Sequence, residues 1–195
     1  MRSLRPHAVC WRNRLPSWSK IARRIRVPLG FVSAGVYLWL AQPTKLSIAI
    51  GSLVAVPGLV IRTLASGHVQ KNEALAVAGP YAHTRNPLYF GSLVMAVGFA
   101  TASRSWWVTL LLLVIFFTIY LPVIRSEEEF LRARFPGFAA YERNVPRLFP
   151  RLRPSVSSTN LFSWHLYWKH REYNAALGTA LMMLGLVLKA FWLPR

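Results

Sequence analysis

Acidic residues are scarce in this sequence, and cysteine is almost absent. The 195 residues include six glutamates, no aspartate and one cysteine, Cys10. A single cysteine excludes an internal disulfide and a cysteine-built metal site, and no metal is expected. Charged residues make up 15% of the chain, whereas a soluble domain carries roughly 25%. This composition argues against a soluble protein.

Long uncharged runs are what the sequence has instead, since 54% of its residues are apolar. A helix needs about 20 apolar residues to cross a bilayer, and several runs approach this length. We therefore predict an all-α, polytopic integral membrane protein of about five transmembrane helices. A basic leader, 1–26, would precede a single membrane domain, 27–195. The predicted spans are 27–44, 46–65, 88–103, 106–124 and 174–192.

The strong positive charge predicts how the chain is oriented. Lys and Arg number 24 and the formal net charge is +18. The leader holds eight of these cations and the segment 125–172 holds nine, and loops rich in Lys and Arg stay cytoplasmic. We therefore expect a cytosolic N-terminus, with tight outer turns at 42–45 and 103–105. Because membrane topology accounts for most of this charge, we expect membrane lipid as a partner and no nucleic acid, which the charge alone would also suit.

A first polar cluster precedes the third predicted span. It reads HVQKNE over residues 68–73, followed by GPYAHTRNPLYFG over residues 79–91. Gly79-Pro80 predicts a turn and Pro87 disfavours helix at Asn86, so a Tyr, a His, an Arg and an Asn share one short irregular segment. Taken singly, each has a simpler explanation: tyrosines favour the membrane interface, and Arg85 could anchor to lipid phosphates.

A second polar cluster follows the fourth predicted span. It begins RSEEEFL at Arg125 and continues to Phe135-Pro136, Tyr141 and the run VPRLFP from Val145. Three consecutive glutamates do not help insertion of a span. A helix start at Ser126 is one explanation, because glutamates suit the first turn of a helix. A role in a pocket is the other.

Together these two clusters resemble the isoprenylcysteine carboxyl methyltransferase family, whose pattern is GPY, R-H-P-x-Y-x-G, then E-E-x-x-L, F-G, Y and V-P. The resemblance covers about residues 67–150 and extends in general plan to phospholipid N-methyltransferases. It implies a membrane enzyme that uses S-adenosylmethionine, with cytosolic motif loops forming the cofactor pocket. It also implies a tunnel from the bilayer for a lipophilic acceptor, such as a prenylated one.

The resemblance also suggests roles for particular residues. Arg85 would bind the cofactor carboxylate, Glu127 or Glu128 its ammonium or ribose hydroxyls, and the tyrosines its adenine. Glu128 or His83 would act as base for an amine acceptor, and Arg125 would steer a carboxylate acceptor. The expected cofactor-binding residues are Tyr81, His83, Arg85, Asn86, Tyr89 and Glu127, and the expected catalytic residues are Glu128 and Arg125.

Two departures from the family pattern stand out. Asn86 occupies the position of the family histidine, and an amide cannot titrate near neutral pH; His83 or His68 are candidates to replace it. Phe135-Pro136 stands in place of F-G. The family pattern does not explain the segment 162–173, for which we hypothesise that Arg171, Glu172 and Tyr173 close the cofactor side of the pocket.

Three rival functions remain open from the sequence. A phospholipid N-methyltransferase differs only in its acceptor, an amine instead of a carboxylate. A non-catalytic membrane scaffold is suggested by Asn86, since the family histidine is missing. A transporter is disfavoured because the predicted spans hold no acidic residue for ion coupling.

Overall fold

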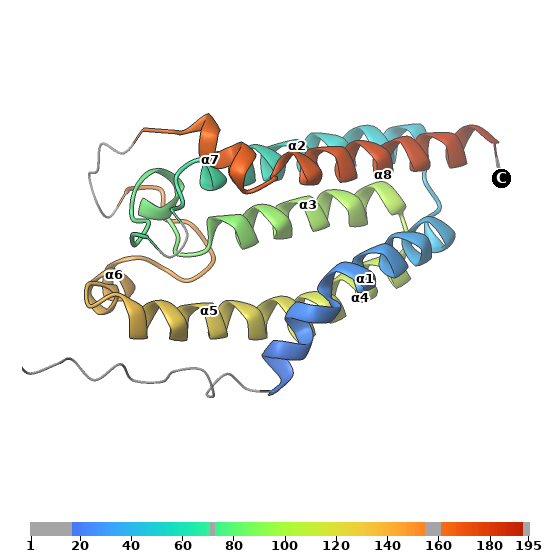
Figure 1. The fold of residues 1–195 in the computed structure, drawn as a ribbon. Coiled ribbons are helices and arrows are strands. Elements are labelled where there is room, and N and C mark those ends of the chain that lie inside the picture. Colours follow the sequence, from blue (N-terminus) through green and yellow to red (C-terminus); the bar gives the residue numbers. More distant parts are fainter. Residues whose placement is uncertain (1–16, 71–72, 155–160, 193–195) are drawn as a thin grey trace, which may run out of the picture.

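The computed structural model describes residues 17–70, 73–154 and 161–192. Within these ranges the chain forms helices and no strand, which confirms the all-α class. α4, η3 and α5 run on as one continuous helix (Figure 1). The elements are α1 (Ser17–Leu40), α2 (Lys45–Ser66), η2 (Gly79–Ala82), α3 (Pro87–Ser103), α4 (Trp106–Ile115), η3 (Phe116–Tyr120), α5 (Leu121–Arg134), α6 (Phe138–Asn144), α7 (Trp164–Lys169) and α8 (Tyr173–Trp192).

Three of these helices are long and apolar enough to cross a membrane: Lys45–Ser66, Trp106–Arg134 and Tyr173–Trp192. Their outward side chains are apolar, as at Leu53, which is 75% exposed, and Leu181, which is 67% exposed. Such surfaces are stable against lipid, and the protein is an integral membrane protein. Shorter apolar helices lie at the other two predicted positions, so the number of five spans stays a prediction.

Helix boundaries differ from the predicted spans at two places. α1 begins at Ser17, inside the predicted basic leader, whose residues 1–16 lie outside the described ranges. The fourth helix continues ten residues beyond the predicted end at 124, to Arg134, because the prediction followed only the uncharged run and a helix can continue into charged residues. A π-helical turn precedes Pro122, where Leu121 N–H donates to the carbonyl of Phe116, five residues back. The Ser-rich stretch 154–160, which the sequence predicts to be a linker, lies outside the described ranges from residue 155 onward.

The connections between helices gather at two opposite ends of the bundle (Figure 1). At one end, Gln42 N–H donates to the carbonyl of Ser103 at 2.7 Å, which ties the two predicted turns together. Lys189 Nζ donates to the carbonyl of Leu38 at the same end. The other end holds η2, α6 and α7. Both turns thus share one end, as expected, while which end faces the cytosol stays a prediction.

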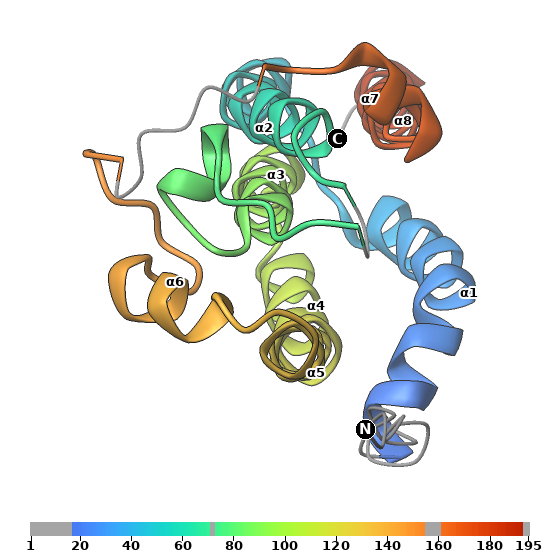
Figure 2. The ribbon, with the colours of Figure 1, turned by 60° about the vertical axis from the view of Figure 1, so that its left-hand side comes forward.

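α2 and α3 form the closest helix pair, which the predicted turns did not indicate. Glycines let their backbones touch: a Cβ on Gly51 would lie 2.5 Å from the carbonyl oxygen of Gly98, and one on Gly58 would lie 2.6 Å from that of Gly91. Viewed from the α6 end, α3 lies between α2 and the α4–α5 helix, and α1 lies away from α2 (Figure 2). The tight α1–α2 hairpin implied by the turn at 42–45 is therefore not formed.

Gly98→Ala is expected to destabilise the protein by about 1 to 3 kcal/mol, the usual cost of overpacking. Its Cβ would lie 2.6 Å from Gly51 O and 2.7 Å from Ala55 N, so helix backbones must separate. Gly35→Ala is the matched control, because nothing lies within 4 Å of its Cβ position. Thermal melts in detergent measure both; equal melting temperatures would show that α2 and α3 separate without cost.

Candidate active site

A polar-walled pocket lies where the two sequence clusters meet. It has a volume of about 360 Å³, within the range of roughly 300 to 1,000 Å³ that small-molecule sites occupy. The first cluster contributes Tyr81, Arg85, Asn86 and Tyr89, and the second contributes Glu127. Even Tyr89 and Glu127 are 38 residues apart in sequence, so the fold alone brings the two segments together. Apolar lining comes from Leu75, Ala76, Leu88, Phe130 and Leu131.

The first cluster takes its shape from glycine and proline. Gly79 has φ +57°, a left-handed conformation that favours glycine, and a Cβ there would lie 2.6 Å from His68 Nε2. Pro80 then starts the short 3-10 helix η2, and Pro87 is the first residue of α3, a position where its missing N–H costs nothing. Asn86 is thereby placed at the helix boundary, where it lines the pocket.

The VPRLFP segment holds this loop from outside the pocket. Arg85 N–H donates to the carbonyl of Pro146 at 2.9 Å, and Arg151 N–H donates to that of His83 at 3.0 Å. The Thr84 hydroxyl donates to the carbonyl of Leu148 at 3.0 Å. Hydrogen bonds to backbone carbonyl groups therefore hold the loop and the VPRLFP segment side by side.

Glu128 lies behind the pocket wall and is almost fully buried, at 2% exposure. One carboxylate oxygen accepts from Asn86 Nδ2 at 3.1 Å and lies 3.5 Å from Arg85 Nη1. The other accepts from Arg147 Nε at 2.9 Å. A buried carboxylate is tolerated when it is paired and hydrogen-bonded, and this one joins α5 to both loops.

Arg85 also pairs with Glu142 on α6, with Nη1 2.8 Å from Oε1. Arg132 donates to the same carboxylate, and these hydrogen bonds, first that of Arg132, lower the pKa of Glu142 below its ordinary value. Glu142 therefore stays ionised and holds one edge of the guanidinium. Arg85 Nε is buried and has no partner in the described structure, which leaves a donor on an arginine that lines the pocket.

Glu127, unlike Glu128, lines the pocket. The Tyr89 hydroxyl donates to Glu127 Oε1 at 2.9 Å. The Tyr89 ring meets Tyr120 edge to face, with centroids 5.8 Å apart. This tyrosine therefore contacts the acidic wall of the pocket with its hydroxyl and the membrane-embedded helix with its ring.

Tyr81 and Tyr141 form the buried aromatic side of the pocket. The Tyr141 hydroxyl donates to the carbonyl of Tyr81 at 2.7 Å. Burial raises the pKa of both phenols well above the ordinary value. Both phenols therefore remain neutral, and neither adds a negative charge to the pocket.

Several predicted residues lie outside the pocket lining. His83 hydrogen-bonds through Nδ1 with the carbonyl of Arg151, and Arg125 is on the exposed side of α5. His68 hydrogen-bonds through Nδ1 with the carbonyl of Leu64. Neither histidine lines the pocket, so the family histidine position is filled by Asn86 alone. Roles for these residues, and for Glu128, stay predictions.

The alternative explanation of the three glutamates as a helix start is wrong. The helix begins at Trp106, well before them, and Ser126 Oγ donates back to the carbonyl of Val123 instead of capping. Glu129 is exposed. Because the helix is continuous, its three consecutive carboxylates point in three directions about 100° apart.

Sequence reasoning missed two partners of the site. Arg147 lies in the run VPRLFP and Glu142 directly follows Tyr141, but neither received a role, and only their contacts with Glu128 and Arg85 reveal one. Glu172, hypothesised to close the pocket, instead accepts from Arg62 Nη2 at 2.8 Å. That pair joins α2 to the segment before α8, and neither member lines the pocket. Among the described residues, no three His, Cys, Asp or Glu side chains could hold a metal.

Comparisons with known proteins match the part of the chain that builds this pocket. Residues 58–137 match the sequence model of the phospholipid methyltransferase family. The cobalt-zinc-cadmium resistance protein CzcN of Cupriavidus metallidurans is 34% identical over 122 residues, 63% of this chain and 55% of that protein. The nickel-cobalt-cadmium resistance protein NccN of Alcaligenes xylosoxydans xylosoxydans is 39% identical over 83 residues, 43% of this chain and 39% of that protein.

The chain therefore spans about half the length, or less, of the curated relatives it matches. No solved structure matches it. The matched family region runs from Gly58 on α2 to Gly137 after α5 and includes every described pocket-lining residue except Tyr141. The resemblance seen in the motifs is thus confirmed: residues 58–137 match the phospholipid methyltransferase family, which belongs to the isoprenylcysteine carboxyl methyltransferase-like superfamily.

Proposed function

We propose that this protein is an S-adenosylmethionine-dependent membrane methyltransferase that acts on a lipophilic acceptor. The observation that carries the proposal is the pocket formed jointly by the two motif segments, at one end of a membrane-embedded bundle. The family match over the same residues supports it, because members of that family use S-adenosylmethionine.

The pocket residues suit the parts of S-adenosylmethionine, which supplies an electrophilic methyl group on a sulfonium. Arg85 lines the pocket and would offer its positive charge to the carboxylate of the cofactor, and a hydrogen bond between two charged groups is a strong one. Glu127 offers a carboxylate for the ammonium or the ribose hydroxyls. Tyr81, Tyr89 and Phe130 offer aromatic and apolar surface for adenine.

The chemistry asked of the protein is chiefly orientation and exclusion of water. Methyl transfer from a sulfonium to an anion neutralises charge, and a dry pocket favours such a step relative to water. Leu75, Phe130 and Leu131 supply apolar walls for this purpose. Holding the two reactants in line can lower the barrier by several kcal/mol.

The acceptor group decides which further residues act. A carboxylate acceptor, as in isoprenylcysteine methylation, needs no general base, and Arg125 remains our candidate to steer it. An amine acceptor, as in phospholipid methylation, must lose a proton first. Glu127 is better placed for that than Glu128, because it lines the pocket whereas both oxygens of Glu128 are engaged behind it.

The names of the two relatives refer to resistance to metals. Under this proposal, a connection of the present chain with metal resistance would act through a methylated membrane component. We further propose that the pocket end and the N-terminus face the cytosol, because the segment 125–172 carries nine of the 24 cations and positive loops stay cytoplasmic.

The test is a methylation assay with labelled S-adenosylmethionine and purified protein in detergent. We expect saturable cofactor binding and transfer of label to a prenylcysteine carboxylate or to phosphatidylethanolamine, and the labelled product identifies the acceptor class. Cofactor binding without transfer to any extracted lipid would favour a non-catalytic scaffold. No cofactor binding would overturn the proposal and leave the non-enzymatic functions, a scaffold or a transporter.

A further inference from the structure

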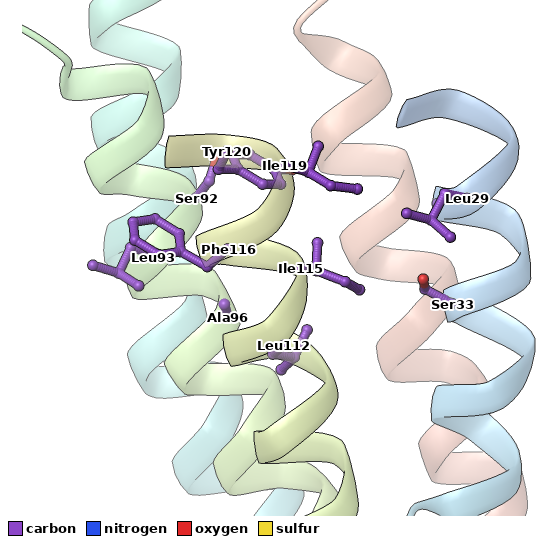
Figure 3. A pocket seen from close by; sticks show the side chains of 11 residues that line it. Leu29, Ser33, Ser92, Leu93, Ala96, Leu112, Ile115, Phe116, Ile119 and Tyr120 are labelled. Carbon is purple, nitrogen blue, oxygen red and sulfur yellow. The ribbon is translucent and has the colours of Figure 1, made fainter. Parts of the chain in front are cut away.

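A second pocket lies deeper in the bundle, between α1, α3 and the helix 106–134. Its volume is about 200 Å³, and an apolar cavity of about 150 Å³ is known to hold a benzene molecule. It therefore has room for a short hydrocarbon segment and not for a whole lipid tail. Figure 3 shows Leu29 and Ser33 of α1 on one side of it and Ser92 of α3 on the other. The remaining lining residues are apolar or aromatic: Leu93, Ala96, Leu112, Ile115, Phe116, Ile119 and Tyr120, with Gly30.

An unusual helix turn supplies part of this wall. The π-helical turn η3 contributes Phe116, Ile119 and Tyr120, and such turns are rare and frequent at functional sites. The rings of Phe116 and Tyr120 stack with centroids 6.2 Å apart. The turn thus presents two aromatic rings to the pocket.

A pair of aromatic rings connects this apolar pocket with the polar one. Tyr89 lines the polar pocket and Tyr120 lines the apolar pocket, and the two rings are in edge-to-face contact. Leu29 packs on the same small cluster, which is built around Ile119 and Val123. The two pockets are therefore neighbours along the seam between α3 and the helix 106–134.

We propose that the apolar pocket holds the part of the acceptor's hydrocarbon chain next to its reacting group, and that Gly30 on α1 and Tyr120 determine the chain width accepted. The proposal rests on the proposed methyltransferase function. Among the described residues that line the pocket none is charged, so an uncharged chain fits it. Part of this wall comes from α1, which lies outside the family match at residues 58–137.

Two glycines of α1 provide a matched test. A Cβ at Gly30 or at Gly35 meets nothing within 4 Å, so a side chain can begin at either position without meeting a neighbour. Gly30 lines the apolar pocket and Gly35 does not. Gly30→Leu should fill the pocket. Gly35→Leu is the control, because it adds the same side chain to α1 at a position that does not line the pocket.

The first measurement is methylation of acceptor probes with short, long and branched alkyl chains on one head group. Gly30→Leu should raise KM for long and branched chains about tenfold or more, with S-adenosylmethionine affinity unchanged. Gly35→Leu should match the wild type. Equal KM values in the two variants, or a loss of cofactor affinity in Gly30→Leu, would overturn the proposal.

The second measurement does not depend on turnover. An alkyl carboxylate carrying a diazirine is photo-crosslinked to the protein in nanodiscs, and labelling at Phe116 is compared with that at Leu113, which is 46% exposed. Gly30→Leu should lower this ratio several-fold and Gly35→Leu should not. An unchanged ratio in Gly30→Leu would refute the pocket as a chain site, whereas failure to bind S-adenosylmethionine would refute only the proposed reaction.

Discussion

Glu128→Gln is expected to lower the free energy of unfolding by about 3 kcal/mol or more, the usual cost of breaking a buried ion pair from one side. Glu128 is 2% exposed and accepts from Asn86 and Arg147 while lying 3.5 Å from Arg85 Nη1. Without the charge of Glu128, Arg147 loses its carboxylate partner, and Arg85 keeps only Glu142. Thermal melts and denaturant titrations in detergent measure the loss.

Glu129→Gln is the control, because Glu129 is exposed on the same helix and such surface changes stay within about 0.5 kcal/mol. A double-mutant cycle with Arg147→Gln should show that the two losses are not additive, since the residues share one contact. A Glu128→Gln protein that melts like the wild type but cannot transfer methyl groups would assign Glu128 to catalysis instead.

Glu127→Gln is expected to weaken S-adenosylmethionine binding by about 1.5 to 3 kcal/mol, the scale of a hydrogen bond to a charged group, which is roughly ten- to hundredfold in Kd. The melting temperature should change little, because the amide that replaces the carboxylate retains an oxygen to accept from the Tyr89 hydroxyl. Isothermal titration of the cofactor into purified protein measures the effect.

Glu129→Gln again serves as the comparison, since it makes the same chemical change outside the pocket. Equal Kd values for the two variants would remove Glu127 from the cofactor site. A larger loss in Glu129→Gln than in Glu127→Gln would mean that the cofactor lies on the opposite side of α5.

Most of the cofactor-binding residues predicted from the two motifs do line the pocket. Five predicted cofactor residues line the pocket: Tyr81, Arg85, Asn86, Tyr89 and Glu127. Local signals placed the first four, since Gly79-Pro80 and Pro87 bend the chain at positions that the sequence reveals. The position of His83 was not predictable in this way, because whether its side chain faces the pocket or the VPRLFP segment depends on a contact 68 residues away.

The sequence did not predict which way the three consecutive glutamates point. Spacing alone allowed either a helix start or a pocket, and it did not reveal that the helix from Trp106 passes through Pro122 unbroken. Only that continuity sets the directions of the three carboxylates. It turns Glu127 into the pocket, Glu128 into the buried ion network and Glu129 into an exposed position.

By itself the sequence determined that this is an all-helical membrane protein, because long uncharged runs have no other stable form in a bilayer. It also determined the positions of the turns and the residues of the two motifs. The tertiary structure alone decided that α2 packs on α3 and that Arg147 and Glu142 hold the motif residues. It likewise placed an apolar pocket beside the polar one. Periodicity and composition record the local environment of each segment, whereas these contacts join residues far apart in the chain and exist only once the helices have packed.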